Sequence, residues 1–176
     1  MNKRTVGLPA PDFDLLSTKD LSSLNERIKL RDYQGKWLLL FFYPYDFSFV
    51  CPTELRALSE RYEEFKDLDC EVIGVSTDSI YTHRAWIQTL PADNGLGAIR
   101  YPLASDRTKE VARAYGVLNE QTGVAERGLF IIDPQGIIRY QVVTDENIGR
   151  DVDETLRVLQ ALQSGGLCPA NWKPQN

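Results

Sequence analysis

The stretch WLLLFFYPYDFSFVCPTEL, residues 37–55, holds the clearest structural signal in the chain. Its apolar run from Trp37 to Tyr43 is typical of a short strand that is buried on both faces. Pro44 ends the run, because proline has no N–H to donate within a sheet. A loop then leads to Cys51, and a helical pattern begins directly after it. We therefore predict a strand, a loop and a helix, with a cysteine where the helix begins.

The segments that follow alternate between helix-like and strand-like patterns. Residues 53–68 carry apolar side chains at helical spacing, and residues 71–76 form a second apolar strand. Other patterns predict helices over 79–90, 109–115 and 151–164, a hairpin of strands 128–132 and 136–143, and a short strand or turn within 14–31. A parallel strand–helix–strand unit combined with an antiparallel hairpin predicts an α/β fold with a central mixed sheet flanked by helices.

Length and composition favour one soluble domain over residues 1–176. The chain is 43% hydrophobic and 26% charged, and its net charge is −5. An acidic balance argues against nucleic acids or an anionic membrane as partners. The first seven residues carry two basic side chains but no apolar run behind them, so we expect no signal peptide. The longest apolar run is far below the roughly 20 residues of a membrane span. We therefore expect a cytoplasmic protein.

The cysteines suggest redox chemistry more than a structural framework. There are three, Cys51, Cys70 and Cys168, and an odd number without a signal peptide argues against structural disulfides. Zinc needs about four closely spaced ligands, whereas these cysteines are far apart and His83 is the only histidine. We expect no metal site and no cofactor.

The position of Cys51 allows two interpretations. Pro52 suits the first position of a helix, which places Cys51 at or next to the N-cap. There the N–H groups of Thr53 and Glu54 and the positive end of the helix dipole would favour a reactive thiolate. Many free cysteines, however, are simply small buried hydrophobes. The position of Cys51 alone does not decide between these two interpretations.

The surrounding residues decide it by resemblance. Residues 42–55 resemble the active-site signature of the peroxiredoxins, in which Pro44, Ser48 and Cys51 match its proline, hydroxyl residue and cysteine. More narrowly they are similar to the typical two-cysteine branch, which includes the alkyl hydroperoxide reductase and thiol-specific antioxidant proteins. The resemblance covers most of the chain and implies a thioredoxin-like fold. Ser48 departs from the commoner threonine but keeps the hydroxyl group.

The resemblance also implies a mechanism and roles for site residues. The thiolate of Cys51 would reduce hydrogen peroxide and organic hydroperoxides, becoming a sulfenic acid. Ser48 and a backbone N–H near Cys51 would bind the peroxide, Pro44 would shield the thiolate from water, and Arg127 would polarise the substrate. On its own, Arg127 could equally be a surface arginine paired with its neighbour Glu126. We group Glu54 with Ser48 and Arg127 at the substrate-binding site, where it could orient that arginine, but it could also simply be a charge in the first turn of a helix.

Cys168 matches the resolving cysteine of the typical two-cysteine branch, in a Gly-rich tail at residues 165–176. In that branch it comes from the partner subunit, which implies a homodimer that can assemble into a decameric ring. A thioredoxin or a flavoprotein disulfide reductase would reduce the resulting disulfide. Cys168 could otherwise be an idle tail thiol, and we interpret Cys70 as structural.

Other functions remain open at this point. The chain could serve as a chaperone-like ring, as a redox relay to a partner protein, or as a one-cysteine peroxidase. It has no C-x-x-C motif, and Glu54 stands where a thioredoxin would carry its second cysteine, which argues against a dithiol oxidoreductase. Residues 94–97 resemble a loop of oxidation-sensitive peroxiredoxins, but the chain ends soon after Trp172, so we expect slower over-oxidation.

Overall fold

The computed structural model describes residues 4–175. Nine strands are present in that range: β1 Asp14–Ser17, β2 Arg27–Lys29, β3 Trp37–Phe42, β4 Cys70–Ser76, β5 Leu103–Ser105, β6 Leu118–Asn119, β7 Val124–Ala125, β8 Arg127–Ile132 and β9 Ile138–Thr144. Seven of them form one sheet in the order β2-β1-β5-β4-β3-β8-β9, while β6 and β7 form a separate small ribbon. The apolar strand of the opening stretch, β3, therefore lies between β4 and β8 in the interior of the sheet.

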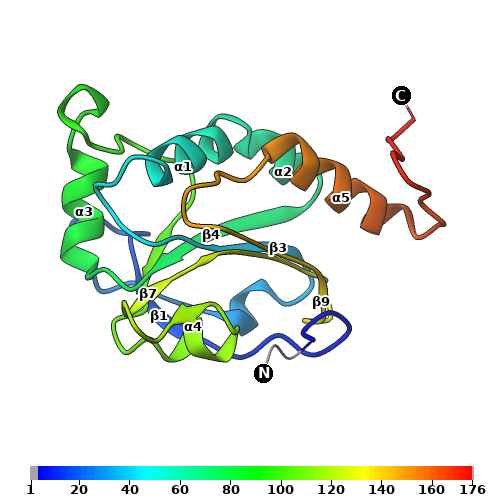
Figure 1. The fold of residues 1–176 in the computed structure, drawn as a ribbon, viewed down its shortest axis with the longest axis horizontal. Helices are drawn as coiled ribbons and strands as arrows, with labels where there is room; N and C mark the ends of the chain where they lie inside the picture. Colours follow the sequence, from blue (N-terminus) through cyan, green and yellow to red (C-terminus); the bar gives the residue numbers. More distant parts are fainter. Residues whose placement is uncertain (1–3, 176) are drawn as a thin grey trace.

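Helices cover both faces of this sheet (Figure 1). The described α-helices are α1 Cys51–Glu60, α2 Tyr62–Asp67, α3 Ile80–Gln88, α4 Glu110–Ala114 and α5 Val152–Ser164, with short 3₁₀ helices at Leu30–Tyr33 and Pro91–Asp93. Helices α1, α2 and α5 lie along one face and α4 lies on the other (Figure 1). Two apolar clusters fill these layers: one contains Leu55, Phe65, Trp86 and Leu159, and the other contains Val111, Ala112, Tyr115 and Phe130.

The pairing of the strands confirms the predicted mixed sheet. Strands β3 and β4 are parallel and joined through α1 and α2, as expected for a strand–helix–strand unit. Strands β8 and β9 form the predicted antiparallel hairpin. Its turn is closed by a bond from the Gly136 N–H to the Asp133 carbonyl, and Gly136 has a φ of 81° that glycine adopts without strain.

Local features differ from the sequence predictions at several places, the unpredicted β6–β7 ribbon among them. The helix predicted over 53–68 begins at Cys51 and is divided at Arg61, whose φ of −98° and ψ of 9° interrupt it. Strand β5 was not predicted, because a strand of three residues after Pro102 is too short to show a period. The ambiguous residues 14–31 contain the hairpin of β1 and β2.

The interior position of β5 leads to a stability prediction. Leu103 is fully buried between β1 and β4, whereas Leu90 is 65% exposed. We expect Leu103→Ala to lower the free energy of unfolding by about 3 kcal/mol, because it leaves a cavity in the core. The matched control, Leu90→Ala, should change it by less than about 0.5 kcal/mol. Urea unfolding of both variants measures the difference, and equal losses would contradict an interior β5.

Candidate functional site

Cys51 lies where β3 and its following loop meet the first turn of α1. It is the first helical residue, Val50 is the N-cap, and Pro52 is the second helical residue, one position later than predicted. The Cys51 side chain is fully buried in the apolar cluster that α1 forms with the sheet. Its sulfur is therefore both at the helix N-terminus, as predicted, and shielded from solvent.

The sequence predicts that backbone N–H groups of the first helical turn face the Cys51 sulfur, and the structure shows a different arrangement. The N–H groups of Thr53 and Glu54 donate to the carbonyl oxygen of Val50, at 3.1 and 3.3 Å. The prediction that these groups face the Cys51 sulfur is therefore wrong for this conformation, because a short turn at Val50 already uses them. The hydrogen bond that the sulfur accepts comes instead from a distant strand.

That group is the guanidinium of Arg127, the first residue of β8. Its Nη1 lies 3.3 Å from Cys51 Sγ and donates to Glu54 Oε1 at 2.6 Å. Its Nε donates to the backbone carbonyl of Glu146 at 2.8 Å. Arg127 is only 3% exposed, so the alternative of a surface pair with Glu126 is wrong. Hydrogen bonds on both sides hold the arginine rigidly against the sulfur.

Glu54 links Arg127 to a second arginine, Arg150. Its carboxylate accepts from Arg150 Nε at 2.6 Å, Arg150 Nη2 at 2.9 Å and the Arg150 backbone N–H at 2.8 Å. Burial alone would raise the pKa of Glu54, but the hydrogen bonds and charge of Arg150, with the charge of Arg127, hold it below its usual value. Glu54 is thus an ionised, buried partner of both arginines rather than a free helix charge.

Arg150 was not predicted to belong to the site. It lies in the loop between β9 and α5, and its Nη1 also donates to the carbonyls of Phe42 and Gly128, each at 2.8 Å. It therefore joins the end of β3, strand β8 and helix α1 in one contact. An arginine in a polar loop resembles any surface arginine, so no local pattern could have identified it.

Beyond its first turn, α1 is fixed to the segment after α3. Tyr101 donates its hydroxyl to the carbonyl of Leu55 at 2.7 Å, and Arg56 donates to the carbonyls of Gly95 and Leu96 at 2.5 and 3.2 Å. The Cys51 turn itself has no side-chain cap. Together with the ion pairs of Glu54, these contacts anchor the helix from Glu54 onward, and only residues 51–53 precede the anchored part.

Pro44 and Ser48 lie in the loop between β3 and α1. Pro44 is buried directly after the strand, while Ser48 is half-buried and donates its hydroxyl to the carbonyl of Tyr45 at 2.9 Å. Phe49 in the same loop is 88% exposed. The structure thus brings Cys51, Arg127 and Glu54 into direct contact, and it places Pro44 and Ser48 in the adjacent loop.

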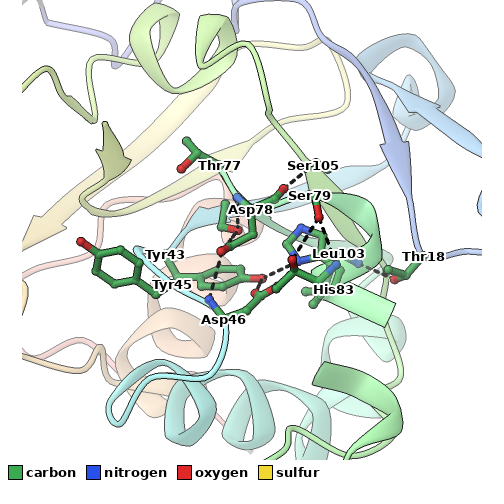
Figure 2. Close-up of polar contacts among 12 residues, drawn as sticks. Thr18, Tyr43, Tyr45, Asp46, Thr77, Asp78, Ser79, His83, Leu103 and Ser105 are labelled. Atoms are coloured by element: carbon green, nitrogen blue, oxygen red, sulfur yellow. Dashed lines mark hydrogen bonds and ion pairs between the residues drawn. The ribbon is translucent and has the colours of Figure 1, made fainter. Parts of the chain in front are cut away.

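A buried polar network fixes the other side of this loop (Figure 2). The hydroxyl of Tyr43 donates to Asp46 Oδ1 at 2.7 Å, and His83 Nδ1 on α3 lies 2.6 Å from Asp46 Oδ2. The Asp46 N–H donates to Asp78 Oδ2 at 3.0 Å. Burial and the neighbouring charge of Asp46 raise the pKa of Tyr43 well above its ordinary value, so its hydroxyl remains a donor.

His83 faces a hydrogen-bond acceptor at each ring nitrogen. Besides Asp46, the carbonyl oxygen of Ala104 lies 2.9 Å from Nε2. With Asp46 ionised, both bonds form only when both nitrogens carry protons. Burial alone would lower the pKa of His83, but the hydrogen bond to Asp46 and the charge of that carboxylate raise it above its ordinary value. The network therefore retains its proton at a higher pH than a free histidine would.

The same residues have the composition of a metal site. One ligand atom each from Asp46, Asp78 and His83 lie within 4.8 Å of one another. Both nitrogens of His83, however, are already engaged with oxygen acceptors, and Asp46 accepts from Tyr43. Protons therefore hold these donor atoms together in the network.

The other two cysteines are in very different surroundings. Cys70 is buried at the start of β4, and burial raises its pKa to about 12, which suits an inert thiol. Cys168 is exposed in the tail after α5, and all three cysteines are free thiols. The tail lies at the opposite end of the molecule from the start of α1 (Figure 1).

This arrangement suits one kind of chemistry. A buried sulfur in contact with a fixed guanidinium can attack a small electrophile, and the same cation can stabilise charge on a leaving atom. The missing element is a neutral base such as histidine, since the one histidine of the chain is committed to the Asp46 network. The substrate must therefore be one that a thiolate attacks directly.

Comparisons with known proteins agree with this chemistry. The AhpC/TSA family matches residues 6–141. The putative peroxiredoxin YkuU of Bacillus subtilis (strain 168) is 62% identical to this chain, and the match covers 99% of this chain and 97% of the YkuU sequence. Peroxiredoxin-1 of Gallus gallus is 50% identical over 98% of this chain and 88% of its own. The reduced 2-Cys peroxiredoxin of Plasmodium vivax superposes with a TM-score of 0.91 at 39% identity, covering 97% of this chain and 90% of its own. The expected thioredoxin-like fold is confirmed.

The Asp46–His83 pair predicts a pH-dependent stability. A histidine whose pKa is raised on folding stabilises the fold fully below its unfolded pKa of 6.5, and this contribution is lost as pH rises through the folded pKa. We therefore expect His83→Gln to cost about 2 kcal/mol at pH 6 and less at pH 9. Urea unfolding at both pH values, at one protein concentration, measures this.

No other histidine is present to produce such a dependence. A loss of stability in His83→Gln that is the same at pH 6 and pH 9 would contradict a charged His83 in the folded protein.

Proposed function

Because the chain belongs to the AhpC/TSA family and is a peroxiredoxin, a thiol peroxidase, we propose that Cys51 is the nucleophile that attacks its hydroperoxide substrates. The contact that carries this proposal is the 3.3 Å approach of Arg127 Nη1 to Cys51 Sγ, with the same nitrogen bonded to Glu54 at 2.6 Å. A guanidinium stays charged at any physiological pH, so it gives the thiolate a permanent counter-charge. Neither Cys70 nor Cys168 has such a partner among the described contacts.

The reaction divides naturally between these groups. The Cys51 thiolate attacks one peroxide oxygen, the O–O bond breaks, and Cys51 becomes a sulfenic acid while the leaving oxygen takes a proton to give water or an alcohol. Arg127 stabilises the negative charge that grows on the oxygens. The Ser48 hydroxyl turns from the Tyr45 carbonyl to the peroxide, and Pro44 keeps bulk water from the sulfur. Hydrogen peroxide and organic hydroperoxides are the proposed substrates.

Glu54 and Arg150 act by positioning. A buried carboxylate with two arginine partners keeps Arg127 in place without adding net negative charge next to the sulfur. Arg150 also ties α1 to the ends of β3 and β8. We assign Glu54 to this orienting role rather than to direct contact with substrate.

Cys168 of the partner subunit is the proposed resolving cysteine. A disulfide requires Cα atoms within roughly 7 Å, and the exposed Cys168 belongs to a tail at the far end of the same subunit from Cys51. Pairing between two subunits removes that obstacle, so the functional unit is a homodimer. The fully buried Cys51 must also become accessible, for which residues 51–53, before the anchored Glu54, have to unwind.

The remaining proposals concern organisation and partners. We assign residues 1–176 to a single domain, with 165–176 as a tail that carries Cys168. Dimers can assemble into a decameric ring, and exposed loop aromatics such as Phe49 offer apolar surface for such contacts. A thioredoxin or a flavoprotein disulfide reductase would recycle the disulfide in the cytoplasm. Among residues 4–175, no helix has the length and apolar character needed to cross a membrane.

The roles of the two cysteines can be tested with Cys51→Ser and Cys168→Ser. In an NADPH-coupled assay with each reductant, Cys51→Ser should have no turnover and Cys168→Ser should lose recycling while still consuming one equivalent of peroxide. On non-reducing gels the wild type should form a covalent dimer after peroxide treatment. A monomeric Cys168→Ser with full turnover would instead identify a one-cysteine peroxidase, and turnover in Cys51→Ser would overturn the proposal.

The orienting role of Glu54 predicts a separate loss of rate. Glu54→Gln keeps the size of the side chain but leaves Arg127 and Arg150 without a buried counter-charge, so Arg127 should no longer be held on the sulfur. We expect the second-order rate of Cys51 oxidation to fall roughly tenfold or more. Glu126→Gln is the matched control, because Glu126 adjoins Arg127 in sequence but accepts from Asn119. Equal rates for the two variants would remove Glu54 from the mechanism.

A further inference from the structure

We propose that Arg157 is a positioning residue that holds the C-terminal tail along α5, so that Cys168 is presented at a defined place for attack on oxidised Cys51 of the partner subunit. This inference rests on the resolving role of Cys168 proposed above. It concerns a residue outside the Cys51 site, on the helix that precedes the tail.

The tail turns back on the last turns of α5. The turn occurs at Gly165, whose φ of 69° lies in the left-handed region. Cys168 Sγ then lies 3.5 Å from the carbonyl oxygen of Ala161 and 3.5 Å from the Ser164 hydroxyl. These are weak sulfur contacts, and they place the thiol beside the final turn of the helix.

Arg157 makes the stronger contact, one helical turn earlier. Its Nη1 donates to the backbone carbonyl of Trp172 at 3.0 Å. Cys168 contacts Ala161 and Trp172 contacts Arg157, and these two helix residues are four positions apart on α5. Cys168 and Trp172 therefore lie along the same side of the helix. The tail therefore runs back along the helix between these two attachment points.

Glu154 fixes the direction of the guanidinium. Its two carboxylate oxygens accept from Arg157 Nε at 2.6 Å and Nη2 at 2.8 Å, a bidentate pair one turn before Arg157. This pair leaves Nη1 directed at the tail. Because the partner is a backbone carbonyl, the contact holds the path of the chain and does not depend on a particular tail side chain.

Apolar packing contributes little to the same attachment. A cavity of about 470 Å³ lies between tail and helix, lined by residues that include Arg157, Ala161, Cys168 and Asn171. Leu167, next to Cys168, is 99% exposed. Among residues 165–175 only Trp172 is half-buried, and the bond from Arg157 to its carbonyl is the shortest hydrogen bond between these residues and α5. Loss of Arg157 should therefore release the tail.

The chemical step explains why release would matter. The Cys168 thiol loses its proton and its sulfur attacks the sulfenic sulfur of Cys51 of the partner subunit. The S–S bond forms, the S–O bond breaks, and the hydroxide takes up a proton and leaves as water. The rate depends on how often the attacking sulfur occupies the right place, so an ordered tail reacts faster than a free one.

The test separates oxidation from resolution. Reduced wild type, Arg157→Ala and Arg157→Lys are mixed with one equivalent of hydrogen peroxide, and samples are alkylated at intervals and run on non-reducing gels. We expect Arg157→Ala to consume peroxide at the wild-type rate but to form the disulfide-linked dimer about fivefold more slowly. Arg157→Lys should be intermediate, because lysine keeps the charge but cannot bind Glu154 and Trp172 with the same fork.

A control variant and three possible outcomes decide between the proposal and its failure. Arg113→Ala removes a similar exposed pair, with Glu120, that does not contact the tail, and it should resolve at the wild-type rate. Disulfide formation at the wild-type rate in Arg157→Ala would overturn the inference. If the wild type itself forms no Cys168-dependent dimer, the resolving role of Cys168 fails and the inference fails with it. Slowed peroxide consumption in Arg157→Ala would also overturn it, since it would indicate a general structural defect.

Discussion

The buried carboxylate of Glu54 is the constraint on which the site depends. An ionised carboxyl group removed from water is costly unless every oxygen finds a charged or polar partner. Here two arginines from separate parts of the chain provide them, Arg127 from β8 and Arg150 from the loop before α5. Each arginine in turn satisfies backbone carbonyls, so one acidic side chain on α1 fixes the relative positions of a helix, two strands and a loop. The sulfur of Cys51 sits at the edge of this arrangement and receives a counter-charge that is already held in place.

A second buried network, built on Asp46, holds the opposite side of the loop between β3 and α1. Asp46 joins Tyr43, the residue after β3, to His83 on α3, all in the interior (Figure 2). The loop that carries Ser48 is therefore held between two buried ionic groups, one built on Glu54 and one built on Asp46. Both groups hold the loop firmly only because their side chains are removed from water, since exposed ion pairs of the same geometry would add little to stability. The apolar layers that exclude water from the two groups are thus part of the site as well as of the fold.

Much of the fold and part of the site could be predicted from the sequence, and there is a physical reason why the other site residues could not. The apolar run at β3, the helix after Cys51 and the hairpin of β8 and β9 each have a period or a turn signal strong enough to be found locally. Cys51 and Arg127 were predicted through the resemblance to the peroxiredoxins, and Glu54 was left open between two roles; the structure joins the three through the Arg127 guanidinium. Arg150 and the Asp46–His83 pair were not found, since each arises from contacts between residues far apart in sequence. The backbone donors of Thr53 and Glu54 were assigned to the sulfur, whereas Val50 uses them.

The anchoring of α1 by Tyr101 and Arg56 has a consequence for how stability and turnover can vary independently. Together with the ion pairs of Glu54, these contacts hold the helix from Glu54 onward, so residues 51–53 form a short segment that can open while the rest of the helix stays folded. Opening such a segment costs far less free energy than global unfolding. Substitutions in the core can then change thermal tolerance without changing how readily the segment opens, and substitutions in the segment can do the reverse. Selection could therefore adjust the speed of the catalytic cycle in relatives of this protein while leaving their melting temperatures almost untouched.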